Sequence, residues 1–580
     1  MLPDDDFREV LAKLFRHEVF RPRTGLDYQA RCELTYERLR VVGEHLPPGS
    51  ELLRDLRKLF AALEWAAVAD PPLFLALTLH VCLGLGAVVE FGGGRAERHV
   101  RELDDMTAFG ALLVTEVGRG NSHLGIRTVA EHDPETGGFR LRTPDGAARK
   151  FMPNVGLAHV PKTGVVYARL RAAGRDHGVF PFVTPIRTAD GTPDGIRVTP
   201  LPEAPLLPLD YAVIEFDGLL LPPSALLSDT ARFDPGGTVD DPLGDPQHRL
   251  RRSLDIRHNA WVASAAALAA VARAGVVNAL RHARTRDTVS PFTGERNVLD
   301  HRAHQRPLFG ALADCYALSC VVDKVKEARV RSQQPGTTGE DDPAWTPGPA
   351  LNRVYGLVKA YASDAAGRIV TECGHRCGAH GVFAPGRWVE YQGMAHMLGP
   401  AAGDGHLIVL EAARALASAD HYEPPPDERI AHDPLDPAAW PGLFRARERV
   451  LHGRLVERMA VARRRGQTGF EAWNNRASAG VEFVQAHVAR LVLDAVREAR
   501  AAVPAGPAAR LADAVQEVHA VRGLVAHAGF HLREGLLTAA QLDRLAERDN
   551  ELCDRVLADL AAVPQLLDAP EELLGHPLWH

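Results

Sequence analysis

This chain has few cysteines and no long block of residues of one charge. Its 580 residues include only seven cysteines, an odd number, which argues against a disulfide framework and favours a reducing, cytoplasmic setting. The net charge is −7 with acidic and basic residues interspersed, so nothing indicates a nucleic-acid surface. Cys373 and Cys377 have no second Cys or His pair nearby in the sequence, and we expect no zinc site.

Long apolar runs are also few. The acidic residues 1–6 lack the basic-then-apolar pattern of a signal peptide. The most apolar stretch, residues 260–277, is rich in alanine and is interrupted by Arg273. It therefore predicts a packed helix, and we expect no membrane span.

The length of the chain exceeds what one hydrophobic core fills, and three or four domains are expected. Apolar residues at helical spacing predict an N-terminal α domain over residues 1–110. Short runs rich in Val, Phe and Ile, separated by turn signals, predict a small β barrel over residues 111–230. Helical spacing returns over residues 249–420, an α bundle, and over residues 441–580, a C-terminal α domain. The predicted fold class is mainly α with a central small β barrel.

One segment, residues 113–128, carries the most chemistry. It places the hydroxyl of Thr115, the carboxylate of Glu116 and three glycines, Gly118 among them, directly after an apolar run. Glycine lets the backbone approach a flat or anionic ligand closely, and a loop of this kind exposes backbone N–H groups. The composition of the segment therefore predicts a ligand-binding loop.

This segment resembles the flavin-contacting segment of the acyl-CoA oxidases, a branch of the acyl-CoA dehydrogenase superfamily. Further matches follow in family order over most of the chain, at residues 133–136, 150–153, 177–187, 281–286, 372–381 and 412–416. The resemblance implies an α, β-barrel, α-bundle, C-terminal α architecture. It also implies FAD as the cofactor, oxygen as the acceptor that reoxidises the flavin, and a homodimer with FAD at its interface.

The resemblance also implies roles for particular residues. The hydroxyl of Thr115 would bond the pyrimidine edge of the flavin, and backbone at Glu116, Gly118 and Gly156 would line the ring. Arg286 would contact the FAD pyrophosphate, which suits a guanidinium fork. Gly378 and Gly381 would let a loop approach the adenosine half.

Each of these residues also has a local interpretation. Thr115 could satisfy its own backbone at a strand end. Arg286 could be a solvated charge at a helix end, and Gly378 and Gly381 could form a helix C-cap and turn. The sequence departs from the family pattern at two places. Asn154-Val155-Gly156 replaces a Gly-Gly turn, and Ala379 replaces a glycine.

The catalytic base of the family is missing. Removing the α-proton of an acyl thioester requires a positioned base, and the family's glutamate position falls on Ala402 here. The position that some relatives use instead falls near Ala260, also without a carboxylate. We take Asp404 as the first candidate for the base, although an Asp there is also a typical helix N-cap.

Two further explanations for the missing glutamate are open. A histidine (His406, His396 or His258) could act on a more acidic substrate. Alternatively, the fold could perform other flavin chemistry, as a monooxygenase or oxidase of a specialised substrate, or the chain could be an inactive paralogue.

The prediction is therefore an FAD-dependent, acyl-CoA oxidase-like oxidoreductase of fatty acid metabolism. It would carry out α,β-dehydrogenation of an acyl thioester, bound to CoA or to an acyl-carrier protein, with O2 as electron acceptor.

Overall fold

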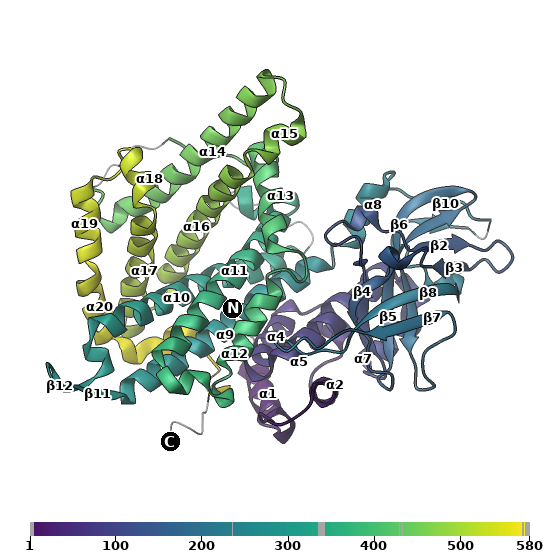
Figure 1. The fold of residues 1–580 in the computed structure, drawn as a ribbon, viewed down its shortest axis with the longest axis horizontal. Coiled ribbons are helices and arrows are strands. Elements are labelled where there is room, and N and C mark those ends of the chain that lie inside the picture. Colours follow the sequence, from purple (N-terminus) through teal and green to yellow (C-terminus); the bar gives the residue numbers. More distant parts are fainter. Residues whose placement is uncertain are drawn as a thin grey trace. The chain divides into compact units, whose positions relative to one another are not determined.

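The chain divides into two compact units, Leu2–Ala263 and Ser264–His580, with Met1 grouped in the second. The computed structural model describes residues 5–234, 236–334, 343–427, 430, 433–570 and 573–574. Helix α9 (Arg257–Thr285) crosses from the first unit into the second (Figure 1). The division into four domains stays a prediction, and the outer ends of its first and last domains lie outside the described residues.

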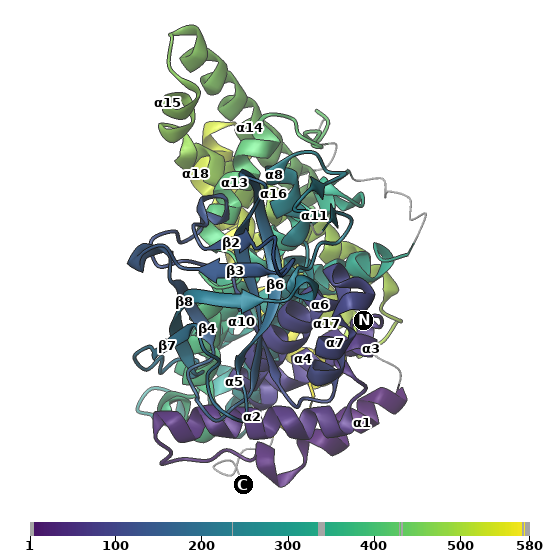
Figure 2. The ribbon, with the colours of Figure 1, turned by 90° about the vertical axis from the view of Figure 1, so that its right-hand side faces the viewer.

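The first unit begins with helices. Asp27 and Asp55 cap two of them by accepting backbone N–H bonds at Ala30 and Lys58, and Pro71 opens a third. A π-helical turn, Thr78–Leu85, links α5 to α6. Figure 2 shows α1 and α2 in purple. The helices are α1 (Asp5–Phe15), α2 (Tyr28–His45), α3 (Gly49–Leu52), α4 (Leu56–Ala69), α5 (Pro71–Leu77), α6 (Gly86–Phe91) and α7 (Glu97–Asp104).

An eight-stranded sheet follows the helices. Six of its strands are hydrogen-bonded in the order β1-β5-β2-β3-β8-β4, with β6 paired to β5 and β7 to β8. An antiparallel bridge between Glu116, just after β1, and Lys150 in β4 joins the two ends of this order, so the sheet closes on itself. The strands are β1 (Phe109–Leu113), β2 (Val129–His132), β3 (Phe139–Arg142), β4 (Lys150–Asn154), β5 (Lys162–Ala172), β6 (Arg175–Arg187), β7 (Ile196–Pro200) and β8 (Tyr211–Leu221).

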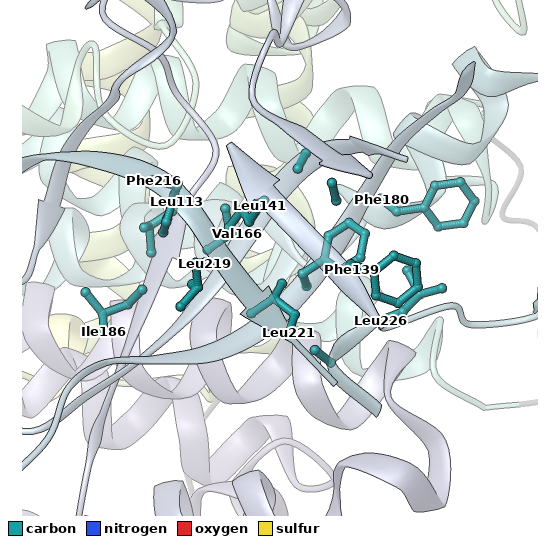
Figure 3. Close-up of a cluster of buried hydrophobic side chains, with 14 of the residues drawn as sticks. Leu113, Phe139, Leu141, Val166, Phe180, Ile186, Phe216, Leu219, Leu221 and Leu226 are labelled. Atoms are coloured by element: carbon teal, nitrogen blue, oxygen red, sulfur yellow. The ribbon is translucent and has the colours of Figure 1, made fainter. Parts of the chain in front are cut away.

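The interior of this barrel is apolar. Along β3 and β8 the side chains alternate between buried and more exposed, as a strand with one face on a core requires. Phe139, Phe182 and Phe216 are each at most 1% exposed, and the rings of Phe139 and Phe182 meet edge to face at 5.2 Å (Figure 3 shows Phe139). The short runs of Val, Phe and Ile that predicted strands are therefore the core of the barrel.

The rest of the first unit leads into the bundle. A small hairpin, β9 (Arg232–Phe233) and β10 (Val239–Asp240), precedes α8 (Pro246–Ser253), which packs on β6. Arg249 of α8 is buried and bonds both Asp229 and Asp241, which fixes this connection to the barrel.

The second unit is helical apart from the hairpin β11 (Asp287–Ser290) and β12 (Gly294–Asn297). Helices α10, α11, α16 and α17 pack along one another, and α14 packs on α16 (Figure 1). The helices are α10 (Arg302–Arg331), α11 (Pro349–Arg376), α12 (Trp388–Leu398), α13 (Gly405–Ala417), α14 (Trp440–Arg464), α15 (Gly469–Asn474), α16 (Ala477–Ala502), α17 (Pro507–Ala526), α18 (Ala528–Arg533), α19 (Ala539–Glu547), α20 (Asp549–Ala558) and α21 (Val563–Leu567).

Two helical stretches, Pro71–Phe91 and Pro246–Thr285, have the length and apolar composition that could cross a membrane. Their most apolar windows are 83% and 100% buried inside the protein, which is how the core helix of a packed domain behaves. All seven cysteines are buried, and none of them forms a disulfide bond.

Candidate functional site

The loop over residues 115–128, here called the Thr115 loop, leaves the barrel directly after β1. Its first residues continue the β ladder, because the N–H of Phe151 donates to the carbonyl of Thr115 at 2.9 Å and the N–H of Val117 donates to Arg149 at 3.0 Å. The side chain of Thr115 is half-buried, and its hydroxyl makes no hydrogen bond within the described part of the chain. The hydroxyl is therefore free to bond a ligand, and the strand-end alternative for Thr115 has no supporting contact.

Glu116 organises this loop through its buried carboxylate. The carboxylate accepts hydrogen bonds from the backbone N–H groups of Arg127 and Thr128 and from the Thr128 hydroxyl at 2.7 Å. It also pairs with the ammonium of Lys150 at 3.1 Å, and both side chains are fully buried. Burial alone would raise the pKa of Glu116, but Lys150 and the Thr128 donors outweigh it, so the pKa lies below its usual value.

Lys150 ties the loop to two strands. Its ammonium donates to the carbonyls of Val114 at 3.2 Å and Tyr167 at 2.7 Å in addition to Glu116. Burial lowers the pKa of Lys150 to about 8, with Glu116 opposing that shift. The Glu116 side chain thus holds the loop in shape, and only its backbone remains available to a ligand.

Gly118 and Gly156 have packing reasons of their own. A Cβ on Gly118 would lie 2.8 Å from the Ala147 Cβ, and the N–H of Gly118 donates to the Ala147 carbonyl. A Cβ on Gly156 would lie 2.9 Å from the carbonyl oxygen of Asp210, to which the N–H of Gly156 donates. Close backbone packing explains both glycines, and their contact with a flavin stays a prediction.

Sequence reasoning gave no role to one basic residue near the Thr115 loop, Arg257. The guanidinium of Arg257 lies 5.1 Å from the ring centre of Trp261 on the next turn of α9. Burial lowers the pKa of His123 in the Thr115 loop, and the positive charges of Arg257 and Lys150 lower it further. The positive charges of Arg257 and Lys150 therefore both act on the Thr115 loop. The only sequence signal was an Arg at the start of the long helix.

The second unit places the residues assigned to the other half of FAD at neighbouring helix ends. Arg286 follows the last residue of α9, is exposed, and its guanidinium makes no hydrogen bond or ion pair to any described residue. Gly378 follows the C-terminus of α11 with φ of +57°, and added side-chain atoms there would meet open space. A Cβ on Gly381 would lie 2.1 Å from the carbonyl oxygen of Gly374, so this position requires glycine.

These ends of α9 and α11 are brought together by contacts between histidines. The rings of His282 and His380 lie 4.9 Å apart. Burial lowers the pKa of His282, and His380 and Arg286 lower it further, so Arg286 is electrostatically coupled to this pair. Arg286, Gly378 and Gly381, which the sequence grouped by resemblance, therefore lie in one region of the second unit.

The loop over residues 399–405, here called the Ala402 loop, joins α12 to α13. Ala402 is exposed with φ of +53°, and Gly403 follows with φ of +98°. Asp404 caps α13, since its Oδ1 accepts bonds from the N–H groups of His406 at 2.9 Å and Leu407 at 3.4 Å. Its Oδ2 has no hydrogen bond within the described chain. The N-cap that the sequence offered as the alternative role for Asp404 is thus present.

A buried lysine on α11 holds the Ala402 loop. The ammonium of Lys359 donates to the carbonyls of Gly399 at 3.0 Å, Ala401 at 2.7 Å and Gly403 at 2.8 Å. Burial lowers the pKa of Lys359 to about 8, and the charge of Asp404 opposes this shift. The three carbonyls use all three donors of the ammonium, so Lys359 supports the loop and has no free lone pair to act as a base.

The histidines named as alternative bases are scattered. His258 is buried, and its ring lies edge-on to Trp261 at 5.6 Å. His396 is exposed on α12, and His406 is exposed at the start of α13. Asp404 is the candidate that lies on the same loop as Ala402.

The overall architecture matches solved acyl-CoA oxidases. The structure of acyl-CoA oxidase 1 from Yarrowia lipolytica aligns with a TM-score of 0.85 at 19% identity, over 99% of this chain and 88% of that one. Acyl-CoA oxidase 2 of Caenorhabditis elegans, bound with FAD, ascaroside-CoA and ATP, aligns with a TM-score of 0.82 at 18% identity, over 98% and 87%. The fold is therefore that of the acyl-CoA oxidases, as the sequence predicted.

Sequence comparisons give the family. Family models match the acyl-CoA oxidase C-alpha1 domain over residues 256–417 and the acyl-CoA oxidase domain over residues 439–578, which together exceed half of the chain. Peroxisomal acyl-coenzyme A oxidase 3 of Arabidopsis thaliana is 24% identical over 90% of this chain and 79% of its own length. Peroxisomal acyl-coenzyme A oxidase 1 of Bos taurus is 24% identical over 83% and 76%. This chain belongs to the acyl-CoA oxidase family, and it is an acyl-CoA oxidase-like flavoprotein oxidoreductase.

Proposed function

We propose that this protein binds FAD and oxidises the α,β bond of an acyl thioester, carried by CoA or by an acyl-carrier protein, with O2 as electron acceptor. The observation that carries the proposal is the unengaged hydroxyl of Thr115, held on a rigid loop in a chain of this family. Related structures support the cofactor and the substrate class, since the nematode enzyme contains FAD and ascaroside-CoA. When bound, FAD supplies a two-electron acceptor for the hydride that leaves the β carbon.

Within each unit, described residues fit one part of such a cofactor. Thr115 offers a free hydroxyl for the flavin, and the charges of Lys150 and Arg257 lie near the same loop. Arg286 offers an unpartnered guanidinium for the pyrophosphate, and Gly378 leaves open space beside it. These are the roles that the family resemblance assigned to Thr115, Arg286 and Gly378.

Asp404 is the base in this proposal. Its Oδ1 is committed to the helix cap, which fixes the carboxylate in place, and its Oδ2 is free to accept the α-proton. Lys359 positions the Ala402 loop by donating hydrogen bonds to three of its carbonyls. Because Ala402 carries no carboxylate, the proton must move to a group two residues further along than in the family pattern.

Anaerobic titration of the flavin-loaded protein with a panel of acyl-CoAs of increasing chain length tests the reaction. We expect bleaching of the flavin absorbance by at least one thioester, followed by recovery when oxygen is admitted. Bleaching only by NAD(P)H with a reductase would identify a monooxygenase instead. Absence of bound flavin in the purified protein would favour the alternative that the chain is an inactive paralogue.

The base is tested by Asp404→Asn, because Asn caps a helix about as well as Asp and cannot take a proton. We expect the rate of flavin reduction to fall by roughly 10²-fold or more with unchanged thermal stability. Asp436→Asn is the matched control, since Asp436 caps a short helix in the same way through Ala438. Equal reduction rates in both variants would remove Asp404 from the mechanism.

We further propose a cytoplasmic homodimer. Scarce, buried cysteines without disulfide bonds support the reducing compartment. The open, αL backbone at Gly378 supports a loop that a second subunit's cofactor could approach. Sedimentation of the flavin-loaded protein, compared with the apoprotein, measures the oligomeric state.

A further inference from the structure

Three basic side chains of the second unit, two of them buried and one half-buried, have no hydrogen-bond acceptor among the described residues. They are Arg447 on α14, His527 at the C-terminus of α17 and His531 on α18, here called the Arg447 cluster. Arg447 is 5% exposed, its Nε is sealed from solvent, and its guanidinium has no hydrogen bond or ion pair to any described residue. His531 is 1% exposed, and its Nδ1 is likewise buried without a partner.

Electrostatics ties the three side chains to one another. Burial lowers the pKa of Arg447, and the carboxylate of Glu482 on α16 is the only charge that opposes this. Burial, followed by the charge of Arg447, lowers the pKa of His527 and of His531 to about 4. At neutral pH both imidazoles are therefore uncharged, and each offers one N–H donor beside a guanidinium. A buried charge without a hydrogen-bond partner is unfavourable, so an anion beside Arg447 would stabilise this arrangement.

A pocket of about 370 Å³ lies further along the same face of α14. Its lining residues are Leu451, Arg454, Leu455, Arg458, Ala479, Glu482 and Arg533. Positions 447, 451, 454 and 458 share one helical face, and Glu482 belongs both to the pocket wall and to the electrostatic surroundings of Arg447. The lining residues therefore come from α14, α16 and α18.

The charges around this pocket leave an excess of positive charge. Glu534 pairs with both Arg454 and Arg533, while exposed Arg458 has no partner among the described residues. Four arginines, counting Arg447, face two carboxylates, Glu482 and Glu534, which leaves two positive charges. A phosphate monoester carries about −1.5 to −2 at neutral pH, which matches this excess.

We propose that the Arg447 cluster binds the phosphate group of a small molecule that enters through this arginine-lined pocket. The planar guanidinium would donate two parallel hydrogen bonds to phosphate oxygens, and the two imidazole N–H groups would donate to the remaining oxygens. The leucines of the pocket would contact the rest of the molecule. This site involves none of the residues assigned to FAD or to the thioester.

Calorimetric titration of the flavin-loaded protein with sodium phosphate and with AMP, at constant ionic strength set by sodium chloride, tests the proposal. We expect at least one probe to bind and Arg447→Met to weaken that binding by roughly 10-fold or more. His531→Phe keeps a planar ring without donors and should weaken it by roughly 3-fold or more. Arg463→Met, an exposed arginine of the same helix, is the control and should bind as the unaltered protein does.

Stability separates this role from a structural one. Without ligand, Arg447→Met removes a buried unpaired charge, so its melting temperature should equal or exceed that of the unaltered protein. Stronger binding of AMP than of phosphate identifies a phosphate ester as the ligand, and equal binding identifies free phosphate. The proposal is wrong if neither probe binds, or if Arg447→Met binds both as tightly as Arg463→Met.

Discussion

The Thr115 loop and the Ala402 loop are built alike, each on one buried lysine, and they differ in what balances that lysine. Lys150 bonds two carbonyls and the buried carboxylate of Glu116. Lys359 bonds three carbonyls and no carboxylate, with Asp404 acting on it only through its charge. The first loop is closed by an ion pair, whereas the second is held only by hydrogen bonds from a cation.

The two loops also differ in whether the supported backbone presents a group for chemistry. In the Thr115 loop, the buried ion pair of Lys150 and Glu116 supports the backbone, and the Thr115 hydroxyl is available to a ligand. The Ala402 loop keeps the support of Lys359 and the αL backbone at Ala402, and it has no carboxylate at position 402, where the sequence resemblance predicts the family's base. Under the proposed function, a glutamate introduced at position 402 is therefore a direct test of this difference.

The largest expected effect is such a repair. In the Asp404→Asn background, Ala402→Glu should restore flavin reduction by an acyl-CoA by roughly 10²- to 10⁴-fold, the range of a positioned general base. Ala402 already adopts φ of +53° and is exposed, so a longer side chain adds no new backbone strain or clash with a core. Stopped-flow absorbance under anaerobic conditions measures the rate. Ala402→Gln is the control, and equal rates for Gln and Glu would show that position 402 does not reach the α-carbon.

The second largest effect is expected on stability, when the ion pair of the Thr115 loop is broken. Lys150→Met leaves the carboxylate of Glu116 buried without its cation, and we expect a loss of about 3–5 kcal/mol in the free energy of unfolding of the first unit. Urea unfolding followed by circular dichroism measures it. The double variant Lys150→Met, Glu116→Gln should recover part of the loss, because no charge is then buried. A single variant as stable as the unaltered protein would show that water reaches Glu116.

A smaller loss of stability is expected when Lys359, the lysine of the Ala402 loop, is replaced. Lys359→Met removes three hydrogen bonds but leaves no charge behind, and the exposed residues Ala402 and Gly403 let part of the loop turn toward water. We expect a loss of about 1–3 kcal/mol in the free energy of unfolding. Hydrogen exchange at the amides of residues 399–405 should accelerate in this variant and not in Lys150→Met. A loss as large as that of Lys150→Met would mean that Lys359 also compensates a buried carboxylate.

The sequence predicted those parts of the fold that have a periodic pattern of apolar residues. Helical spacing and short Val- and Phe-rich runs are periodic signals, and they gave the helices, the barrel and the fold class. The family was predicted from ordered motifs. Asp404 was taken first as the catalytic base, which stays a prediction. Its alternative role as a helix cap has a local sequence signature and is present in the structure. Thr115 was singled out for a hydroxyl next to glycines, although its free hydroxyl became visible only in the structure.

The rest depends on contacts between distant residues. Lys359 lies on α11, some forty residues before the carbonyls that it bonds, and nothing in its neighbours marks it. The Arg447 cluster joins α14 to α17 and α18 across about eighty residues, among many other arginines of ordinary appearance. The contact of Gly118 and Gly156 with a flavin stays a prediction. A glycine in a sequence indicates close packing without showing whether the neighbour is a ligand or another part of the chain, such as Ala147 and Asp210 here.

The smallest expected effect tests the hydroxyl on which the Thr115 loop depends. Thr115→Val keeps the β-branched shape and removes only the O–H, which bonds no described residue. The apoprotein should therefore keep its melting temperature, while the dissociation constant for FAD should rise by roughly 3- to 10-fold, the worth of one neutral hydrogen bond. Quenching of flavin fluorescence on titration measures this constant, and Thr199→Val on the exposed face of β7 is the control. If both variants hold FAD equally, the hydroxyl faces water in the holoprotein, and the loop contributes to the cofactor only through its backbone.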